Sequence, residues 1–179
     1  MNKPKLSIAC AELDIESLRQ SLGLTYDEVV EKFSDARVTS WFAEIWGERI
    51  FGYGRHLSAN HPGSDGAVAF GEFGQIKVGV RCFRRNTLKF QKSVDIGAGR
   101  SSSKERLKQA LMEVDRYVIV DLRFIPKLRF LPLDTKYLID LVSDDRLTIS
   151  GISPSRFDVW LEQQFELEEY SIELLAPDR

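Results

Sequence analysis

The sequence predicts an α/β protein with a small mixed central β-sheet flanked by helices. Three observations lead to this fold class. Stretches with helical spacing of apolar residues lie on both sides of a strand-rich middle. Within that middle, residues 66–83 have the alternation and the glycines of a β-hairpin. Residues 117–122, YVIVDL, are apolar on both faces, which is typical of a central strand covered on each side.

The length of 179 residues suits a single domain that can bury a core. We divide it into a helical N-terminal appendage (1–35), a core (36–150) and a C-terminal helix with an acidic tail (151–179). No apolar run approaches the roughly 18 to 20 residues that span a bilayer, and the N-terminus turns acidic too early for a secretory signal. Two cysteines are too few for a disulfide framework or a zinc site. We therefore expect a cytoplasmic protein without a membrane partner.

Two short helices are expected near the N-terminus. Residues 12–22 place apolar side chains on one helical face, and Gly23 ends that helix. Thr25 and Glu28 form a capping box for a second helix over residues 26–33. Such a pair can be a DNA-reading helix-turn-helix, but it is more often plain scaffold.

A third helix is expected over residues 36–50, ahead of the hairpin. Glu44 and Glu48 are four residues apart on it and share a face. Paired carboxylates can hold a metal ion or orient a catalytic group, while solvated helix charges are the simpler interpretation.

The hairpin at residues 66–83 has the composition of a catalytic site. Residues 66–71 form its first strand, residues 72–74 the turn and residues 75–83 the second strand. Because side chains alternate along a strand, one face of the second strand is apolar. Its other face carries Gln75, Lys77, Gly79 and Arg81. With Asp65 just before the first strand, the hairpin can bring a carboxylate, an amide and an ammonium group to one edge.

Residues 77–108 are strongly basic. They contain ten Lys or Arg against two Asp or Glu, whereas the whole chain has a net charge of −2. A local excess of this kind fits a phosphate-binding surface, although a solvated basic loop explains the charge equally well. A helix is expected over residues 103–114, and its N-terminus beside Arg100 and Lys104 would seat a phosphate.

The C-terminal half adds two strands and two helices. Residues 127–131 are expected to pair with the strand at 117–122. A helix follows over residues 135–142, and a serine–proline pair at 153–154 starts another. An edge strand is expected at residues 170–175.

The order of these elements resembles the core of the PD-(D/E)XK nuclease superfamily. That core runs helix, β-hairpin, helix, strand, and the chain follows the same order between residues 36 and 122. The family signature corresponds to Asp65 followed by Gln75-Ile76-Lys77. The resemblance implies a restriction-endonuclease-like fold, with residues 36–150 as the nuclease-like core.

The resemblance also implies roles for these side chains. Asp65 and Gln75 would hold a divalent metal ion, Mg²⁺ with Mn²⁺ as a substitute, and Lys77 would position or activate the attacking water. Glu44 would serve as an accessory carboxylate. The physical chemistry agrees, because phosphodiester hydrolysis needs charge neutralisation and a poised water. Mg²⁺ prefers hard oxygen ligands and keeps several waters, so one or two carboxylates suffice.

The motif departs from the usual pattern in one respect. Gln75 stands where the family normally has an acidic residue, and glutamine is a weaker metal ligand, although Gln-x-Lys variants occur in the superfamily. In a second register, Lys77 stands in the place of the acidic residue and Gly79 in the place of the lysine, which predicts a non-cleaving relative. The structural alternatives are a turn stabilised by Asp65 and an edge strand whose solvent face carries Gln75 and Lys77.

The first hypothesis is therefore a Mg²⁺-dependent endonuclease that cleaves DNA, as a homodimer or with a partner subunit. Its DNA contacts would come from Arg81, Arg84, Arg85, Lys89, Gln91, Lys92, Arg100 and Lys104. The alternative is an inactive protein of the same fold that binds nucleic acid or acts as an interaction subunit. A purely structural α/β domain is a third possibility, and it predicts no salt-sensitive DNA binding.

Overall fold

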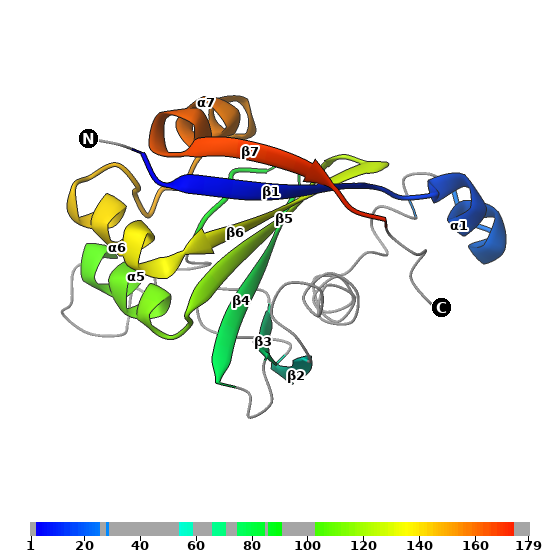
Figure 1. Cartoon of the computed structure of the whole chain (residues 1–179). Helices are drawn as coiled ribbons and strands as arrows, with labels where there is room; N and C mark the ends of the chain where they lie inside the picture. Colours follow the sequence, from blue (N-terminus) through cyan, green and yellow to red (C-terminus); the bar gives the residue numbers. More distant parts are fainter. Residues whose placement is uncertain are drawn as a thin grey trace.

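A computed structural model describes residues 3–25, 28, 54–58, 66–70, 75–84, 86–90 and 103–173. Within these residues, seven strands form one mixed sheet, and four helices accompany it (Figure 1). The predicted α/β class, with a mixed central sheet flanked by helices, is confirmed. The restriction-endonuclease-like label stays a prediction.

The sheet has the strand order β2-β3-β4-β5-β6-β1-β7. The elements are β1 (Lys5–Glu12), α1 (Ile15–Leu22), β2 (Gly54–Ser58), β3 (Gly66–Phe70), β4 (Ile76–Phe83), α5 (Ser103–Met112), β5 (Arg116–Phe124), β6 (Lys127–Asp134), α6 (Thr135–Ser143), α7 (Pro154–Gln164) and β7 (Glu166–Ser171). The pairs β4–β5 and β1–β7 are parallel, and the other neighbours are antiparallel. Since parallel neighbours need a crossover, α5 lies on the connection between β4 and β5.

The two faces of β5 show how the core is divided. Tyr117 and Ile119 join an apolar cluster with residues of α5, α6 and α7. Val118 and Val120 point to the opposite face and join a second cluster with Val78 of β4. All five side chains are buried. The alternation confirms that this strand is central and apolar on both faces, as the sequence predicts.

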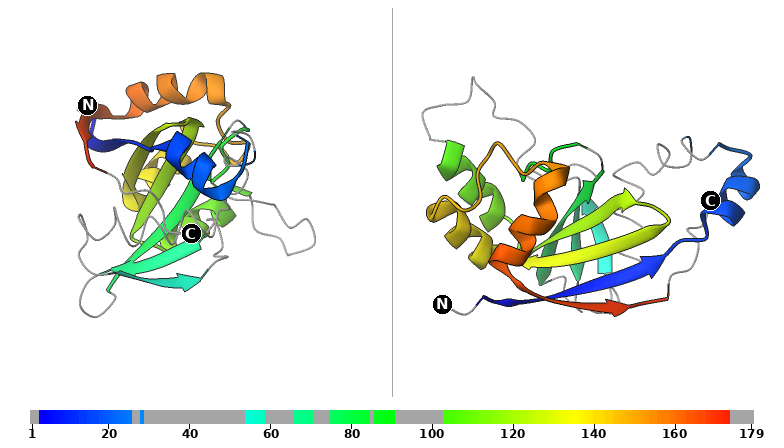
Figure 2. Two further views of the ribbon diagram at one scale, coloured as in Figure 1. Left: turned by 90° about the vertical axis from the view of Figure 1, so that its right-hand side faces the viewer. Right: turned by 90° about the horizontal axis from the view of Figure 1, so that it is seen from above.

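Three of the four described helices, α5, α6 and α7, gather toward one end of the molecule. α5 and α6 lie together at that end, α7 lies over β1 and β7 in the view of Figure 1, and α1 lies at the far end (Figures 1 and 2). None of the helices in the described residues is long and apolar enough to cross a membrane.

The N-terminal assignment needs a correction, because the chain begins with a strand and not with a helical appendage. β1 pairs with β6 on one side and with β7 on the other, so it lies inside the sheet. Its residues Leu6, Ile8 and Ala9 are buried. The helix expected from residue 12 begins only at Ile15. Pairing with strands more than a hundred residues away decides this strand, and local periodicity carries no trace of such pairing.

Several local signals near the N-terminus are confirmed. Gly23 ends α1 in the left-handed conformation, with φ of 65°. The capping box is formed in both directions. The backbone N–H of Glu28 donates to Thr25 Oγ1 at 3.3 Å, and the N–H of Thr25 donates to Glu28 Oε2 at 2.8 Å. The rest of the helices expected over residues 26–33 and 36–50 lies outside the described residues.

The C-terminal elements lie close to their expected positions. Asp134 caps α6, and its carboxylate accepts the N–H of Tyr137 at 3.2 Å. α7 begins at Pro154, as the serine–proline pair predicts. The edge strand differs in its bounds, because β7 begins at Glu166 and ends before most of the range 170–175.

Candidate functional site

The register of β3 and β4 determines which residues of the predicted hairpin site lie opposite each other. Gly66 pairs with Val80, and Ala69 pairs with Lys77. A strand rises about 3.3 Å per residue, so the pair Gly66–Val80 lies roughly 10 Å along the sheet from the pair Ala69–Lys77. The backbone at the start of β3 therefore faces the far half of β4, three residues beyond Lys77.

The predicted metal ligands are only partly described. Asp65 and Glu44 lie outside the described residues. Gln75 and Lys77 are both exposed at the start of β4. Among the residues that the structure describes, no group of three or more His, Cys, Asp or Glu side chains could hold a metal ion. The assignment of Mg²⁺ or Mn²⁺ to this hairpin stays a prediction.

The backbone of Lys77 is fixed by the strand next to it. Its N–H donates to Asp115 Oδ2 at 2.8 Å, and its carbonyl accepts the N–H of Asp115 at 2.7 Å. These bonds close the end of the parallel ladder, one residue before Val78 pairs with Arg116. The carboxylate of Asp115 thus accepts a backbone hydrogen bond, while the side chain of Lys77 is exposed.

Arg81 occupies a different environment from the one expected for a DNA contact. Its side chain lies on the helix-covered face of β4, and the residue is only 5% exposed. Its Nε donates to the hydroxyl of Tyr117 at 2.9 Å, and that hydroxyl lies 3.5 Å from the carbonyl of Phe90. Its Nη2 is buried and has no hydrogen-bond partner among the residues that the structure describes. The prediction of Arg81 as a surface contact is therefore wrong, because Arg81 packs beside the buried Tyr117 and Phe90, although it shares a face of β4 with the exposed Lys77.

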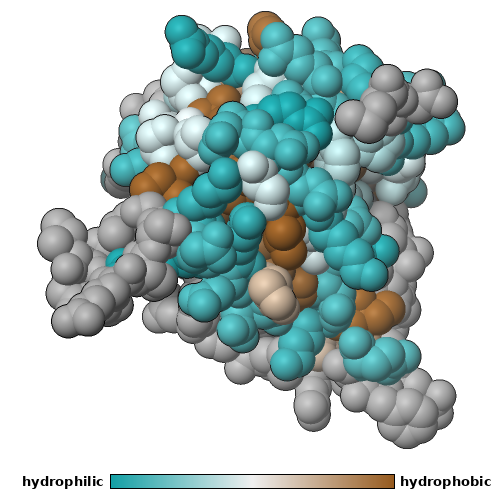
Figure 3. Space-filling view, turned by 90° about the vertical axis from the view of Figure 1, so that its left-hand side faces the viewer, coloured by the Kyte–Doolittle hydropathy of each residue, from teal (hydrophilic) through white to brown (hydrophobic). Residues whose placement is uncertain are grey.

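The other predicted DNA contacts do not gather on one described surface. Lys89 is exposed and Arg84 is half-buried. Lys104 donates to the carbonyl of Ser143 at 3.0 Å and pairs with Asp145 at 3.1 Å, so it joins α5 to the end of α6. Arg85, Gln91, Lys92 and Arg100 lie outside the described residues. Seen from the side of α5 and α6, the surface is mostly hydrophilic, with small apolar patches between polar side chains (Figure 3).

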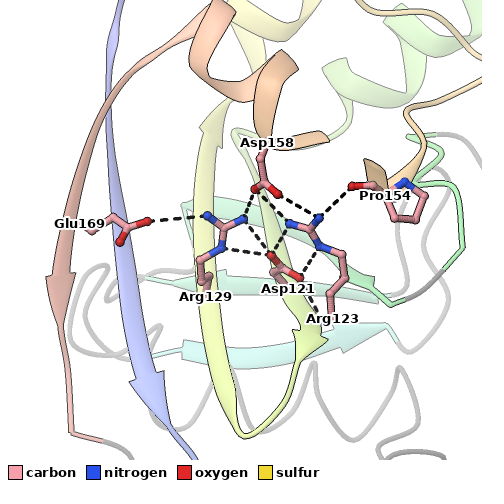
Figure 4. Close-up of polar contacts among 6 residues, drawn as sticks. All are labelled: Asp121, Arg123, Arg129, Pro154, Asp158 and Glu169. Carbon is pink, nitrogen blue, oxygen red and sulfur yellow. Dashed lines mark hydrogen bonds and ion pairs between the residues drawn. The ribbon is translucent and has the colours of Figure 1, made fainter. Parts of the chain in front are cut away.

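A cluster of charged side chains lies between α7 and the β5–β6 hairpin (Figure 4). Asp121 is 1% exposed at its centre. Its Oδ2 accepts from Nη2 of Arg123 at 2.9 Å and from Nη2 of Arg129 at 2.9 Å. Asp158 of α7 accepts from the same two guanidinium groups at 3.2 and 2.8 Å. Glu169 of β7 lies 3.7 Å from Arg129. Charge-assisted hydrogen bonds therefore join β5, β6 and α7, and the longer ion pair with Glu169 adds β7.

The electrostatics of this cluster favour its charged state. Burial alone would lower the pKa of Arg123 and of Arg129, but hydrogen bonds and charges from Asp121 and Asp158 outweigh it and raise both pKa values. Burial alone would raise the pKa of Asp158, but the two arginines outweigh it and hold that pKa below its ordinary range. The guanidinium of Arg123 also stacks 4.5 Å from the centre of the Phe83 ring. We interpret the cluster as a structural clamp, because each carboxylate is paired and the cations are enclosed.

Sequence reasoning missed this cluster, although one signal was present. Asp121 stands inside the apolar run of β5, where a charged residue must be paired if the strand is central. The partners Arg123 and Arg129 lie on the same hairpin and were available as candidates. The contribution of Asp158, from a distant helix, has no local signal.

Comparison with protein-family models, with curated proteins and with solved structures gives no match to this chain. No family is assigned to it on that basis. The resemblance to PD-(D/E)XK nucleases therefore stays a prediction from the motif and the order of elements.

Proposed function

We propose that this protein binds nucleic acid on a nuclease-like fold and does not cleave it. The observation that carries the proposal is the positive charge of residues 77–108, in which Lys77 and Lys89 are exposed. Arg81 bears only on the absence of cleavage, because a buried cation occupies the part of β4 that faces the start of β3. In a nuclease of the resembled family, metal-binding and water-positioning groups would be expected on these two strands.

The order and direction of the strands support the nuclease-like fold. β2, β3 and β4 form an antiparallel meander, α5 follows, and β5 returns parallel to β4. This is the hairpin, helix and strand order on which the resemblance depends.

The scarcity of metal ligands on β4 supports the absence of cleavage. The sequence has no carboxylate between Gln75 and Arg84, and Mg²⁺ needs hard oxygen ligands at about 2.1 Å. The neighbouring carboxylate of Asp115 already accepts a backbone N–H from Lys77. The pair Gly66–Val80 lies roughly 10 Å along the sheet from the pair Ala69–Lys77, which further weakens the prediction that one metal ion contacts both strands.

The charge distribution supports a phosphate-bearing partner. Residues 77–108 have a net charge of +8. Lys77 and Lys89 are exposed within this segment. We further propose DNA as the partner, a cytoplasmic location, and a homodimer or partner subunit.

Fluorescence anisotropy with a labelled DNA duplex tests the binding. The wild type should bind with an affinity that falls steeply as salt rises, because phosphate contacts release counterions. The double variant Lys77→Ala/Lys89→Ala should bind more weakly, with a log–log salt slope reduced by about two. The matched control is Lys127→Ala/Lys136→Ala, which removes two exposed charges outside the basic segment and should leave the slope unchanged. Equal slopes for the two double variants, or no binding at low salt, would contradict the proposal.

Plasmid nicking with Mg²⁺ or Mn²⁺ distinguishes the second candidate, the endonuclease. The exposed Gln75 and Lys77 at the start of β4 are the observation in its favour. We expect no metal-dependent nicking by the wild type. Nicking that is lost in Lys77→Ala would establish the endonuclease instead.

A further inference from the structure

A half-open cavity of about 700 Å³ lies beside α7 and shares no residue with the β3–β4 hairpin. Its walls are the connection between α6 and α7, the first turns of α7, and Thr87. Pockets of roughly 300 to 1,000 Å³ commonly hold small-molecule ligands. The cavity is therefore large enough for a small-molecule ligand. Such a ligand plays no part in the proposed nucleic-acid binding.

The walls of the cavity are fixed by hydrogen bonds at several points. Leu88 and Ile152 exchange two backbone hydrogen bonds, each of 2.9 Å, which hold the connection against the segment after β4. The indole Nε1 of Trp160 donates to the carbonyl of Arg146 at 2.8 Å. The N–H of Arg146 in turn donates to the carbonyl of Leu141 at 2.8 Å. A ligand would enter a site whose shape is already formed, which lowers the entropic cost of binding.

Hydroxyl groups are concentrated in the lining. The lining hydroxyls belong to Thr87, Thr148, Ser150, Ser153 and Ser155. Two pairs of them are in contact, at 2.7 Å between Thr148 and Ser150 and at 3.2 Å between Ser153 and Ser155. Each hydroxyl can donate one hydrogen bond and rotate to suit an acceptor. Trp160 and Val159 add an apolar part to the same lining.

The charges around the cavity leave one cation available. Asp145 pairs with Lys104, and Arg146 pairs with Asp144 at 3.2 Å. The guanidinium of Arg156 has no ion-pair or hydrogen-bond partner among the described residues, and it is exposed in the first turn of α7. A single unpaired guanidinium beside several hydroxyl donors suits an anion with more oxygens than a carboxylate.

We propose that this cavity binds a small phosphomonoester of about nucleotide size. Its phosphate would accept hydrogen bonds from Arg156 and from the hydroxyls of Ser153 and Ser155, since phosphate offers three strong acceptor oxygens. Its organic part would lie against the apolar surface of Val159 and Trp160. The site is separate from β4, so this proposal and the nucleic-acid proposal can fail independently.

Isothermal titration calorimetry on the full chain, with AMP, adenosine and inorganic phosphate as probes, tests the proposal. AMP should bind more tightly than either adenosine or phosphate, because it engages both parts of the cavity. Arg156→Gln should weaken AMP binding by about tenfold or more, since a charge-assisted hydrogen bond is lost. The matched control Lys136→Gln removes an exposed charge that does not line the cavity and should change the affinity by less than about twofold.

The contrary results are equally specific. No heat of binding with AMP at concentrations up to about 10 mM would overturn the proposal. Equal AMP affinity in the wild type and in Arg156→Gln would also overturn it. Inorganic phosphate binding as tightly as AMP would overturn the assignment of a phosphomonoester. Because Arg156 is exposed, the variant should fold, and circular dichroism would verify that.

Discussion

Gly151 is a position where a single methyl group should be costly. Its backbone has φ of 82°, and a Cβ there would lie 2.3 Å from the carbonyl oxygen of Leu88. That oxygen belongs to the bridge with Ile152, so the methyl group would disrupt a hydrogen bond as well as strain the backbone. We expect Gly151→Ala to lower the free energy of unfolding by about 2–4 kcal/mol, measured by urea denaturation.

Gly23 provides the control for this prediction. It also has positive φ, at 65°, but nothing lies within 4 Å of a Cβ built on it. Gly23→Ala should therefore carry only the conformational term, about 1–2 kcal/mol. If Gly151→Ala lowers the free energy of unfolding no more than Gly23→Ala does, the Leu88–Ile152 bridge can move to accommodate the methyl group, which would contradict the prediction.

Arg81 tests whether a buried cation in β4 costs stability. Its Nη2 has no hydrogen-bond partner among the described residues, and an apolar residue of similar length removes that unsatisfied group. Arg81→Met should leave the free energy of unfolding unchanged within about 1 kcal/mol or raise it, measured by urea denaturation. DNA affinity measured by anisotropy should stay unchanged, because the buried side chain does not contact a phosphate. A marked loss of stability, or a loss of DNA affinity in a variant that folds, would contradict this prediction.

At the scale of the element, α7 is held by both apolar and ionic contacts. Phe157 and Leu161 are buried in the cluster that α5 and α6 share. Asp158 of the same helix reaches Arg123 and Arg129 on the β5–β6 hairpin. The apolar contacts hold the helix against the sheet, and the ionic contacts fix where it lies along the hairpin.

Asp158→Asn tests the ionic part of this attachment. The variant should lower the free energy of unfolding at pH 7 by about 1 kcal/mol, a modest value because the Asp158 side chain is 49% exposed and partly screened. Asp140→Asn, on the exposed surface of α6, is the control and should have almost no effect. A larger loss in the control than in Asp158→Asn would contradict the clamp.

The pH dependence of this difference has a definite sign. The pKa of Asp158 is lowered in the folded state, where its two arginine partners outweigh the effect of burial. Its contribution to stability is therefore complete above its ordinary pKa of 3.8 and is lost as the pH falls through the folded-state value. The wild type and Asp158→Asn should therefore converge in stability as the pH falls below 3.8 and through the lowered folded-state pKa of Asp158.

At the scale of the whole molecule, β1 makes the N-terminus part of the sheet. It lies between β6 and β7, and it is the strand that joins β7 to the rest of the described sheet. Its side chains contribute to both apolar clusters, with Ile8 in the cluster under the helices and Ala9 in the other. The two halves of the chain should therefore unfold together.

Ile8→Ala tests whether the two halves of the chain unfold together. Ile8 is fully buried, so truncation should lower the free energy of global unfolding by about 2–5 kcal/mol. Lys5→Ala, on the same strand, removes only an exposed ion pair with Glu168 and should cost less than about 1 kcal/mol. Amide hydrogen exchange should show that protection falls in β5 as well as in β1. Protection lost in β1 alone would mean that the N-terminal strand opens separately.

Much of the fold is predictable from local patterns. Asp134 and Pro154 mark helix starts, Gly23 marks a helix end, and the apolar run of β5 marks a central strand. These signals depend on residues near one another in the chain, where capping and side-chain periodicity operate. β1 was not predictable in the same way, because its partners are far away in sequence.

The sequence by itself determined the α/β class, the β3–β4 hairpin, the starts of α6 and α7 and the concentration of positive charge in residues 77–108. Only the tertiary structure decided where the charged side chains of this segment lie. The pairing of β3 with β4 places Gly66 opposite Val80 and not opposite Lys77. Packing beside Tyr117 buries Arg81, although it shares a face of β4 with the exposed Lys77. Packing of α7 then created both the clamp around Asp121 and the cavity beside Arg156. The physical reason is that register, burial and charge pairing are set by contacts between distant segments.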